Sequence, residues 1–273
     1  MSTEKAEALV LRVIEFSESS SVVTLFTREF GKISGLAKGA RRPKGPFESA
    51  LDLLSRVRLV FLRKSSDALD LLTEAKLERR FRPQTGDLSR LYGAYYVAEL
   101  LGDLTHDGDP HPELFDLAVD TLEHLSGGSL SAGIVVLRFE LSALRMLGHL
   151  PSLRECAECG NAVAGSRRTA FGFAVGGVLC EACRPGKKHV VSLSNEAIES
   201  LEALASENEA WQSRVIERRH AGEMRGAVSQ YVVYLLGHKP RMHEYLGVPG
   251  GHPSKQADGN SVKQADGNSV ETN

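Results

Sequence analysis

The pattern of apolar and polar residues changes near residue 83. Before this point, short segments rich in β-branched and aliphatic residues are separated by turn residues such as Gly, Ser and Asp. Five such segments lie at residues 8–14, 21–27, 31–37, 55–62 and 69–75. Segment 21–27 alternates apolar and polar residues, as a strand with one buried face does. Short strands spaced in this way predict a small closed or nearly closed β-barrel.

After Pro83 the apolar residues recur at helical spacing. The predicted helices cover about residues 88–104, 113–125, 131–147, 195–206 and 221–236. Asp87 and Ser194 are suitable N-caps for two of them, and Gly148 is a suitable C-terminal stop. Helices that share one apolar core form a bundle. The predicted fold class is therefore multi-domain α+β, with a barrel followed by a helical domain.

These changes of pattern divide the chain into five parts. We expect a barrel at 1–82, a first helical part at 83–150, a cysteine module at 151–190, a second helical part at 191–250 and a tail at 251–273. The tail contains the same polar octapeptide twice in tandem, at 255–262 and 263–270. A repeat this polar cannot bury a core, so we expect the tail to be disordered.

The chain has four cysteines, which form two Cys-x-x-Cys pairs. The pairs are Cys156 with Cys159 and Cys180 with Cys183, and 20 residues separate Cys159 from Cys180. This spacing is typical of one tetrahedral zinc site with two ligands from each pair. Four thiolates would leave no coordination position for a catalytic water, so the zinc would be structural. A redox dithiol and an iron–sulfur cluster are the alternatives.

Charge is distributed unevenly, although the net charge is only −2. Residues 1–82 carry 16 Lys and Arg against 11 Asp and Glu, whereas residues 83–150 carry 3 against 10. Residues 151–190 carry 6 against 3. For nucleic-acid binding the local balance matters more than the overall charge, which makes the first segment and the cysteine segment the candidates.

The first segment contains a basic stretch between two predicted strands. Its cations are Lys38, Arg41, Arg42 and Lys44, interleaved with Gly and Pro, and Arg56, Arg58 and Arg63 follow in the next strand and its exit. Arg56 and Arg58 are two residues apart and should point to the same sheet face. Such a patch can neutralise phosphates, and the alternative is a solvated face without a ligand. Phe47 and Phe61 are candidate stacking platforms for bases, or else core residues.

Other polar clusters carry no recognisable chemistry. Segment 103–113 is rich in Asp, His and Pro but matches no calcium or zinc motif, so we interpret it as an interhelical loop. The sequence has no phosphate-binding loop, no zinc-protease motif, no nucleophile elbow and no dinucleotide fingerprint. We therefore expect a binding protein and not an enzyme.

Motifs in a fixed order over about residues 1–240 resemble those of the RecO family, the bacterial recombination mediators of DNA repair. They lie at residues 7–11, 24–32, 35–42, 109–115, 138–141 and 147–151, followed by the first Cys-x-x-Cys and Gly160. The resemblance implies an N-terminal OB-fold and a helical C-terminal domain that often carries a zinc-finger loop. After Pro240 the chain departs from the small basic run typical of the family.

The resemblance also implies a function. A protein of this kind would bind single- and double-stranded DNA, anneal complementary strands and associate with RecR. With RecR it would help load RecA onto DNA coated by single-strand-binding protein, whose tail would bind the helical half. The expected location is cytoplasmic and nucleoid-associated, since no run of about 18 apolar residues and no signal-peptide core is present. The alternative is a zinc-containing adaptor or regulator whose barrel binds a protein partner.

Overall fold

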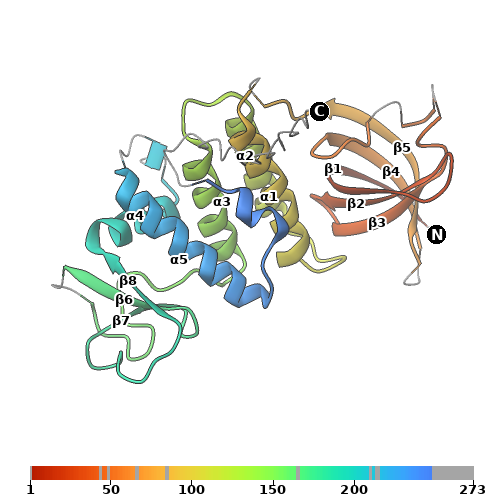
Figure 1. Cartoon of the computed structure of the whole chain (residues 1–273). Helices are drawn as coiled ribbons and strands as arrows, with labels where there is room; N and C mark the ends of the chain where they lie inside the picture. Colours follow the sequence, from red (N-terminus) through yellow and green to blue (C-terminus); the bar gives the residue numbers. More distant parts are fainter. Residues whose placement is uncertain are drawn as a thin grey trace, which may run out of the picture.

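The computed structural model describes residues 2–42, 45–47, 50–64, 68–83, 86–163, 167–208, 211–212 and 216–247. The predicted DNA-binding residue Lys44 and the predicted disordered tail lie outside these ranges. Within them, a β-barrel stands at one end, helices form the middle, and a small sheet lies at the other end (Figure 1).

The N-terminal region is a five-stranded barrel. Its strands are β1 (Ser2–Glu15), β2 (Ser21–Thr27), β3 (Gly31–Ala37), β4 (Arg56–Arg63) and β5 (Asp70–Arg79), closed in the order β1-β2-β3-β5-β4. Strands β3 and β5 pair in parallel, and the other pairs are antiparallel. Strand β1 is long enough to pair with β2 near its end and with β4 near its start, which closes the barrel. The expected OB-fold barrel is confirmed, and β1 extends beyond the predicted segment 8–14 at both ends.

Alternate residues of each strand fill the barrel interior. Along β2 and β3 the odd-numbered residues are buried and most even-numbered residues are half-buried, as the period-two pattern predicts. Phe47 and Phe61 belong to this core, with exposed fractions of 1% and 0%. The hypothesis that these two rings serve as stacking platforms is therefore wrong, because neither ring face can reach a ligand.

The helices follow the predicted order. They are α1 (Leu88–Leu104), α2 (Pro112–Gly127), α3 (Ala132–Met146), α4 (Asn195–Ala205) and α5 (Arg218–Leu236), with a short 3₁₀ helix η2 (Arg241–Tyr245). The side chains of Asp87 and Ser194 accept hydrogen bonds from backbone amides of the first turn, which confirms them as N-caps. Gly148 follows α3 with a φ of 77°, a left-handed conformation that suits glycine at a helix end. Among the helices in the described part of the chain, none combines the length and apolar character needed to span a bilayer.

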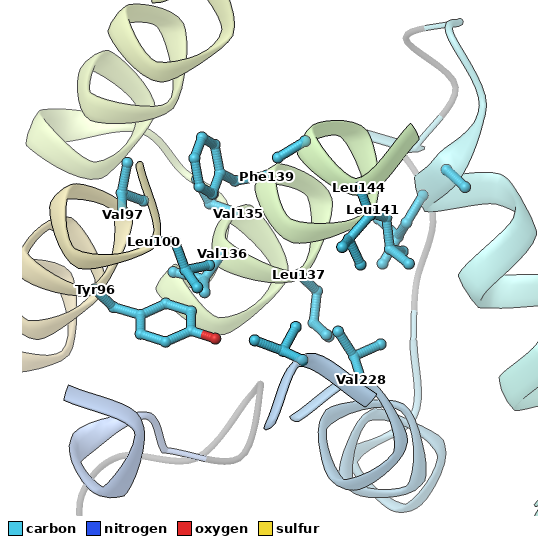
Figure 2. Packing of buried hydrophobic residues seen from close by; sticks show 14 of the residues in the cluster. Tyr96, Val97, Leu100, Val135, Val136, Leu137, Phe139, Leu141, Leu144 and Val228 are labelled. Atoms are coloured by element: carbon cyan, nitrogen blue, oxygen red, sulfur yellow. The ribbon is translucent and has the colours of Figure 1, made fainter. Parts of the chain in front are cut away.

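One apolar core joins these helices. Figure 2 shows Leu100 of α1 beside Val136 of α3, and Leu137 of α3 turned toward Val228 of α5. Tyr96 of α1 and Phe139 of α3 belong to the same buried cluster. Each of these side chains is at most 5% exposed. The helical half is therefore a single packed body although the cysteine module interrupts it in sequence.

The loop between α1 and α2 joins the helices to the barrel. Gly31 lies so close to this loop that a Cβ atom on it would meet the carbonyl oxygen of Asp109 at 2.0 Å, and its φ of 66° also favours glycine. The Lys32 Nζ donates to the carbonyl oxygens of Gly102 and Thr105, both at 2.7 Å, near the C-terminal end of α1. Residues 105–111 thus form an interhelical loop within the predicted segment 103–113, whose ends belong to α1 and α2, and this loop is also a docking surface for β3.

The cysteine module contains a three-stranded antiparallel sheet, which the sequence pattern did not predict. Its strands are β6 (Arg168–Gly172), β7 (Gly177–Leu179) and β8 (Val190–Ser194), in the order β7-β6-β8. Strand β8 leads directly into α4, whose N-cap is Ser194. The module is therefore anchored on the helical half by a continuous strand–helix connection.

Candidate functional site

The four cysteines converge on one point, although 20 residues separate the two pairs. Their Sγ atoms all lie within 4.8 Å of one another, and the Sγ atoms of Cys159 and Cys180 are 3.8 Å apart. Four thiolates bound to zinc at about 2.3 Å in a tetrahedron would have sulfur–sulfur distances of about 3.8 Å. The arrangement fits a tetrahedral metal ion held by Cys156, Cys159, Cys180 and Cys183.

Each cysteine pair sits on a tight turn that presents its sulfur atoms. The amide of Gly160 donates to the carbonyl of Cys156 at 2.8 Å, and a φ of 75° at Gly160 lets the chain reverse. In the second turn the amides of Cys183 and Arg184 donate to the carbonyl of Cys180 at 3.2 and 3.1 Å. Two turns of the same kind thus face each other.

The thiols influence one another's protonation. Backbone hydrogen bonds, the strongest of them from Cys180, lower the pKa of Cys156 to about 6. Hydrogen bonds to Cys180 and Cys159 raise the pKa of Cys183 to about 12. Several thiolates cannot coexist at this spacing without a compensating cation, because each repels the next. A divalent ion would remove that penalty, which is the behaviour of a metal site.

The predicted basic loop is exposed on the barrel. Lys38, Arg41 and Arg42 are all exposed, and the structure gives Lys38 and Arg42 no carboxylate partner among its described residues. Arg41 forms an exposed ion pair with Glu15 at 3.0 Å. Its amide donates to the carbonyl of Ser19 at 3.2 Å, which holds the loop against the β1–β2 turn.

Two predicted cations on β4 have acidic partners. The guanidinium of Arg56 lies 2.9 Å from Glu7 and 3.4 Å from Glu78, and Arg58 lies 2.7 Å from the same Glu78. Burial opposes the charge of Arg56, but the hydrogen bond and charge of Glu7 outweigh it and raise its pKa. The two side chains do lie on one strand face, as expected, but the carboxylates reduce their net positive potential.

Arg63 has a third environment. Its guanidinium carbon lies 5.2 Å from the ring centre of Phe30, a cation–π contact. The predicted cations therefore occupy three different settings: an exposed loop, an ion-paired strand face and an aromatic contact. The loop is the setting in which positive charge is most available to a ligand.

A cleft lies between the barrel and the helices and was not predicted from the sequence. It has a volume of about 720 Å³ and is lined by Arg12, Lys32, Lys239 and Arg241 together with Glu99, Asp103 and Asp107. These residues come from distant parts of the chain, so no motif could signal them. Because cations and carboxylates both line it, the cleft has no strong charge preference.

Comparisons with known proteins agree with the two-part architecture. The family model described as "Recombination protein O N terminal" matches residues 1–81, and "Recombination protein O C terminal" matches residues 85–244. The chain is 41% identical over 263 residues to "DNA repair protein RecO" of Rhodopirellula baltica, covering 88% of this chain and 97% of that protein. It is 34% identical over 247 residues to a protein of the same name from Anaeromyxobacter dehalogenans, covering 90% of this chain and 96% of that one.

Proposed function

Because the chain belongs to the RecO family of DNA repair proteins, we propose that it is a DNA-binding mediator of recombinational repair and not an enzyme. The observation that carries the proposal is an exposed basic loop on an OB-fold barrel, within a chain that matches both family models. OB-fold barrels commonly bind oligonucleotides on the face of their second and third strands and on adjoining loops.

We assign the main phosphate contacts to Lys38, Arg41, Arg42 and Lys44. Exposure of the first three supports this assignment, because an exposed cation can neutralise a phosphate. Lys38 and Arg42 have no carboxylate partner among the described residues, and the ion pair of Arg41 with Glu15 is exposed and therefore weak. Arg56, Arg58 and Arg63 are weaker contributors in this proposal, since each already interacts with a carboxylate or a ring.

The mechanism proposed is annealing by charge neutralisation. Two complementary strands repel each other through their phosphates, and a basic surface that binds the backbone lowers this repulsion while the bases remain free to pair. With RecR, the protein would then help RecA to replace single-strand-binding protein, whose tail would bind the helical half. Each step is a binding event, so no nucleotide hydrolysis by this chain is required.

We propose that the metal at the four cysteines is a structural zinc ion. The tetrahedral fit of the sulfur atoms supports this, and four protein ligands leave no position for substrate. Zinc bound to thiolates would hold the two turns together and so maintain the small sheet that leads into α4.

Salt-dependent binding of a labelled single-stranded oligonucleotide tests the DNA assignment. Binding should be tight at low salt. The logarithm of the binding constant should fall linearly with the logarithm of the salt concentration. Changing Lys38, Arg41 and Arg42 together to Gln should make this negative slope shallower by about 2, since each phosphate contact on a single strand contributes about 0.7 to its magnitude. The matched control changes three exposed cations elsewhere, Lys5, Lys76 and Arg218, to Gln.

The same measurement addresses the alternative function. A barrel that binds a protein partner instead of DNA would show no oligonucleotide binding at low salt. Equal losses in the loop variant and in the control variant would mean that only net charge matters, and the assignment to the loop would then fail.

A further inference from the structure

One aromatic side chain on the barrel is exposed to an unusual degree. Phe16 lies in the turn between β1 and β2 with 66% of its surface exposed, the largest fraction among the large apolar side chains of the described residues. Its backbone is held, since its amide donates to the carbonyl of Ser20 at 2.9 Å. Exposing a large ring costs the stability that its burial would give. An exposed ring on a backbone held in this way is suited to contact a ligand.

Phe16 lies beside the basic loop. Arg41 reaches this turn in two ways, through its amide to the carbonyl of Ser19 at 3.2 Å and through its guanidinium to Glu15 at 3.0 Å. The guanidinium also approaches the carbonyl of Ser17 at 3.5 Å. The turn that carries the ring and the loop that carries the cations therefore form one rim of the barrel.

An apolar row on the outer barrel surface leads to the same rim. Strand register places Ile14 opposite Val22, Val22 opposite Leu36, and Leu36 opposite Leu71. Val22 and Leu36 alternate with the buried residues of their strands, so the row faces outward, and Ile14 is 43% exposed. A parallel polar row consists of Arg12, Thr24 and Ser34. Apolar contact area and the cation Arg12 thus lie side by side on the β1–β2–β3 face, and the cations of the basic loop lie at its rim.

We propose that Phe16 is a base-stacking platform that makes this face selective for single-stranded over double-stranded DNA. The inference rests on the proposed DNA-binding function. It adds a contact that would distinguish single-stranded from double-stranded DNA. Every base has a flat π-face that can stack on an aromatic ring, so stacking is tolerant of sequence. In a duplex these faces are already stacked inside the helix and are not available to Phe16. The neighbouring cations would hold the phosphates of either form.

Substitutions at Phe16 separate stacking from charge. Phe16→Ala should lower the affinity for a single-stranded oligonucleotide about tenfold, the loss typical of removing one stacking ring. The slope of affinity against salt should stay unchanged because no phosphate contact is removed. Affinity for a duplex of the same length should also stay unchanged, and Phe16→Trp should retain single-strand affinity.

Two further variants serve as controls. Phe16→Leu keeps an apolar side chain but removes the ring, so it should lose affinity nearly as much as Phe16→Ala. Tyr234→Ala removes a ring that is 49% exposed on α5 and should leave DNA affinity unchanged. An oligonucleotide carrying 2-aminopurine, whose fluorescence falls on stacking, should be quenched by the unmodified protein and less by Phe16→Ala. Thermal unfolding of each variant should match the unmodified protein, since the ring is exposed.

These measurements separate the stacking role of Phe16 from DNA binding by the protein as a whole. If the unmodified protein binds single strands and Phe16→Ala binds them equally well, the stacking platform is refuted while the proposed function stands. Full affinity in Phe16→Leu, or an equal loss for duplex DNA, would also refute it. If the unmodified protein binds no DNA at low salt, the proposed function itself fails.

Discussion

The core of the helical half and the basic loop of the barrel hold charged side chains in opposite ways. Glu140 and Arg225, whose side chains are 0% and 7% exposed, form an ion pair at 2.5 Å between α3 and α5. The Tyr96 hydroxyl of α1 donates to the same carboxylate at 2.7 Å. On the barrel, Lys38, Arg41 and Arg42 stand in solvent. The difference indicates that the buried charge in the helical half fixes the packing, whereas charge on the basic loop of the barrel is available for a ligand.

The cysteine site belongs with the helical half in this comparison. Its four thiols are gathered at one point and depend on one another, so removing a ligand should have a large effect. The barrel cations act separately, so removing one should have a small effect.

Removing the metal should have the largest effect. Binding of a structural zinc by cysteine ligands contributes about 10–16 kcal/mol of apparent free energy in small zinc modules, and this energy drives their folding. We expect Cys180→Ser with Cys183→Ser to abolish metal binding and to expose residues 151–190 to proteolysis. Elemental analysis should find one zinc per unmodified chain and none in the variant. A module that stays protease-resistant without metal would contradict the structural role.

Breaking the buried ion pair should have the next largest effect. Glu140→Ala leaves the Arg225 guanidinium buried without its carboxylate, which typically costs about 3–5 kcal/mol. Urea unfolding of the zinc-loaded protein should show this loss. Replacing both partners with apolar residues, Glu140→Leu with Arg225→Met, should restore much of the stability. An effect of Glu140→Ala as small as that of a surface substitution would mean that the pair is not buried.

Lowering the pH should destabilise the folded protein through Glu223, which links the cysteine module to α5. Burial alone would raise the pKa of Glu223, but hydrogen bonds from Ser194 and Arg168 hold it below the ordinary value of 4.5. A carboxylate with a lowered pKa stabilises the folded state above its unfolded pKa, and the stabilisation is lost as the pH falls through the folded value. The thermal midpoint of the unmodified protein should therefore fall more steeply below about pH 4.5 than that of Glu223→Gln. Parallel curves for the two proteins would contradict this role.

A single ion-paired barrel cation should have the smallest effect. Arg58 already contacts Glu78 at 2.7 Å, so Arg58→Gln should change single-strand affinity less than about twofold. Arg42→Gln is the matched comparison on the exposed loop and should weaken binding more. Fluorescence anisotropy at low salt measures both variants. A larger loss for Arg58→Gln would reverse the ranking of the two surfaces.

Local signals in the sequence predicted much of this structure. Short segments of β-branched and aliphatic residues between turn residues identified the barrel strands. Asp87 and Ser194 marked helix starts, because capping depends on only the next few residues. The Cys-x-x-Cys spacing predicted the gathered thiols, since metal ligation imposes a fixed local turn. In each case the physical rule acts over a short stretch of chain.

Features that depend on contacts between distant residues could not be predicted in the same way. The carboxylate partners of Arg56 and Arg58 come from other strands, so no local pattern could indicate their neutralisation. Phe47 and Phe61 have the aromatic rings that base stacking requires, but both are buried, whereas Phe16 is exposed. The close approach of Gly31 to Asp109 likewise depends on how the barrel and helices meet.

Annealing of complementary oligonucleotides coated with single-strand-binding protein tests the central claim most directly. The unmodified protein should accelerate the appearance of duplex, and changing Lys38, Arg41 and Arg42 together to Gln should remove most of this acceleration. The control variant at Lys5, Lys76 and Arg218 should retain it. No acceleration by the unmodified protein would contradict its assignment as a recombination mediator.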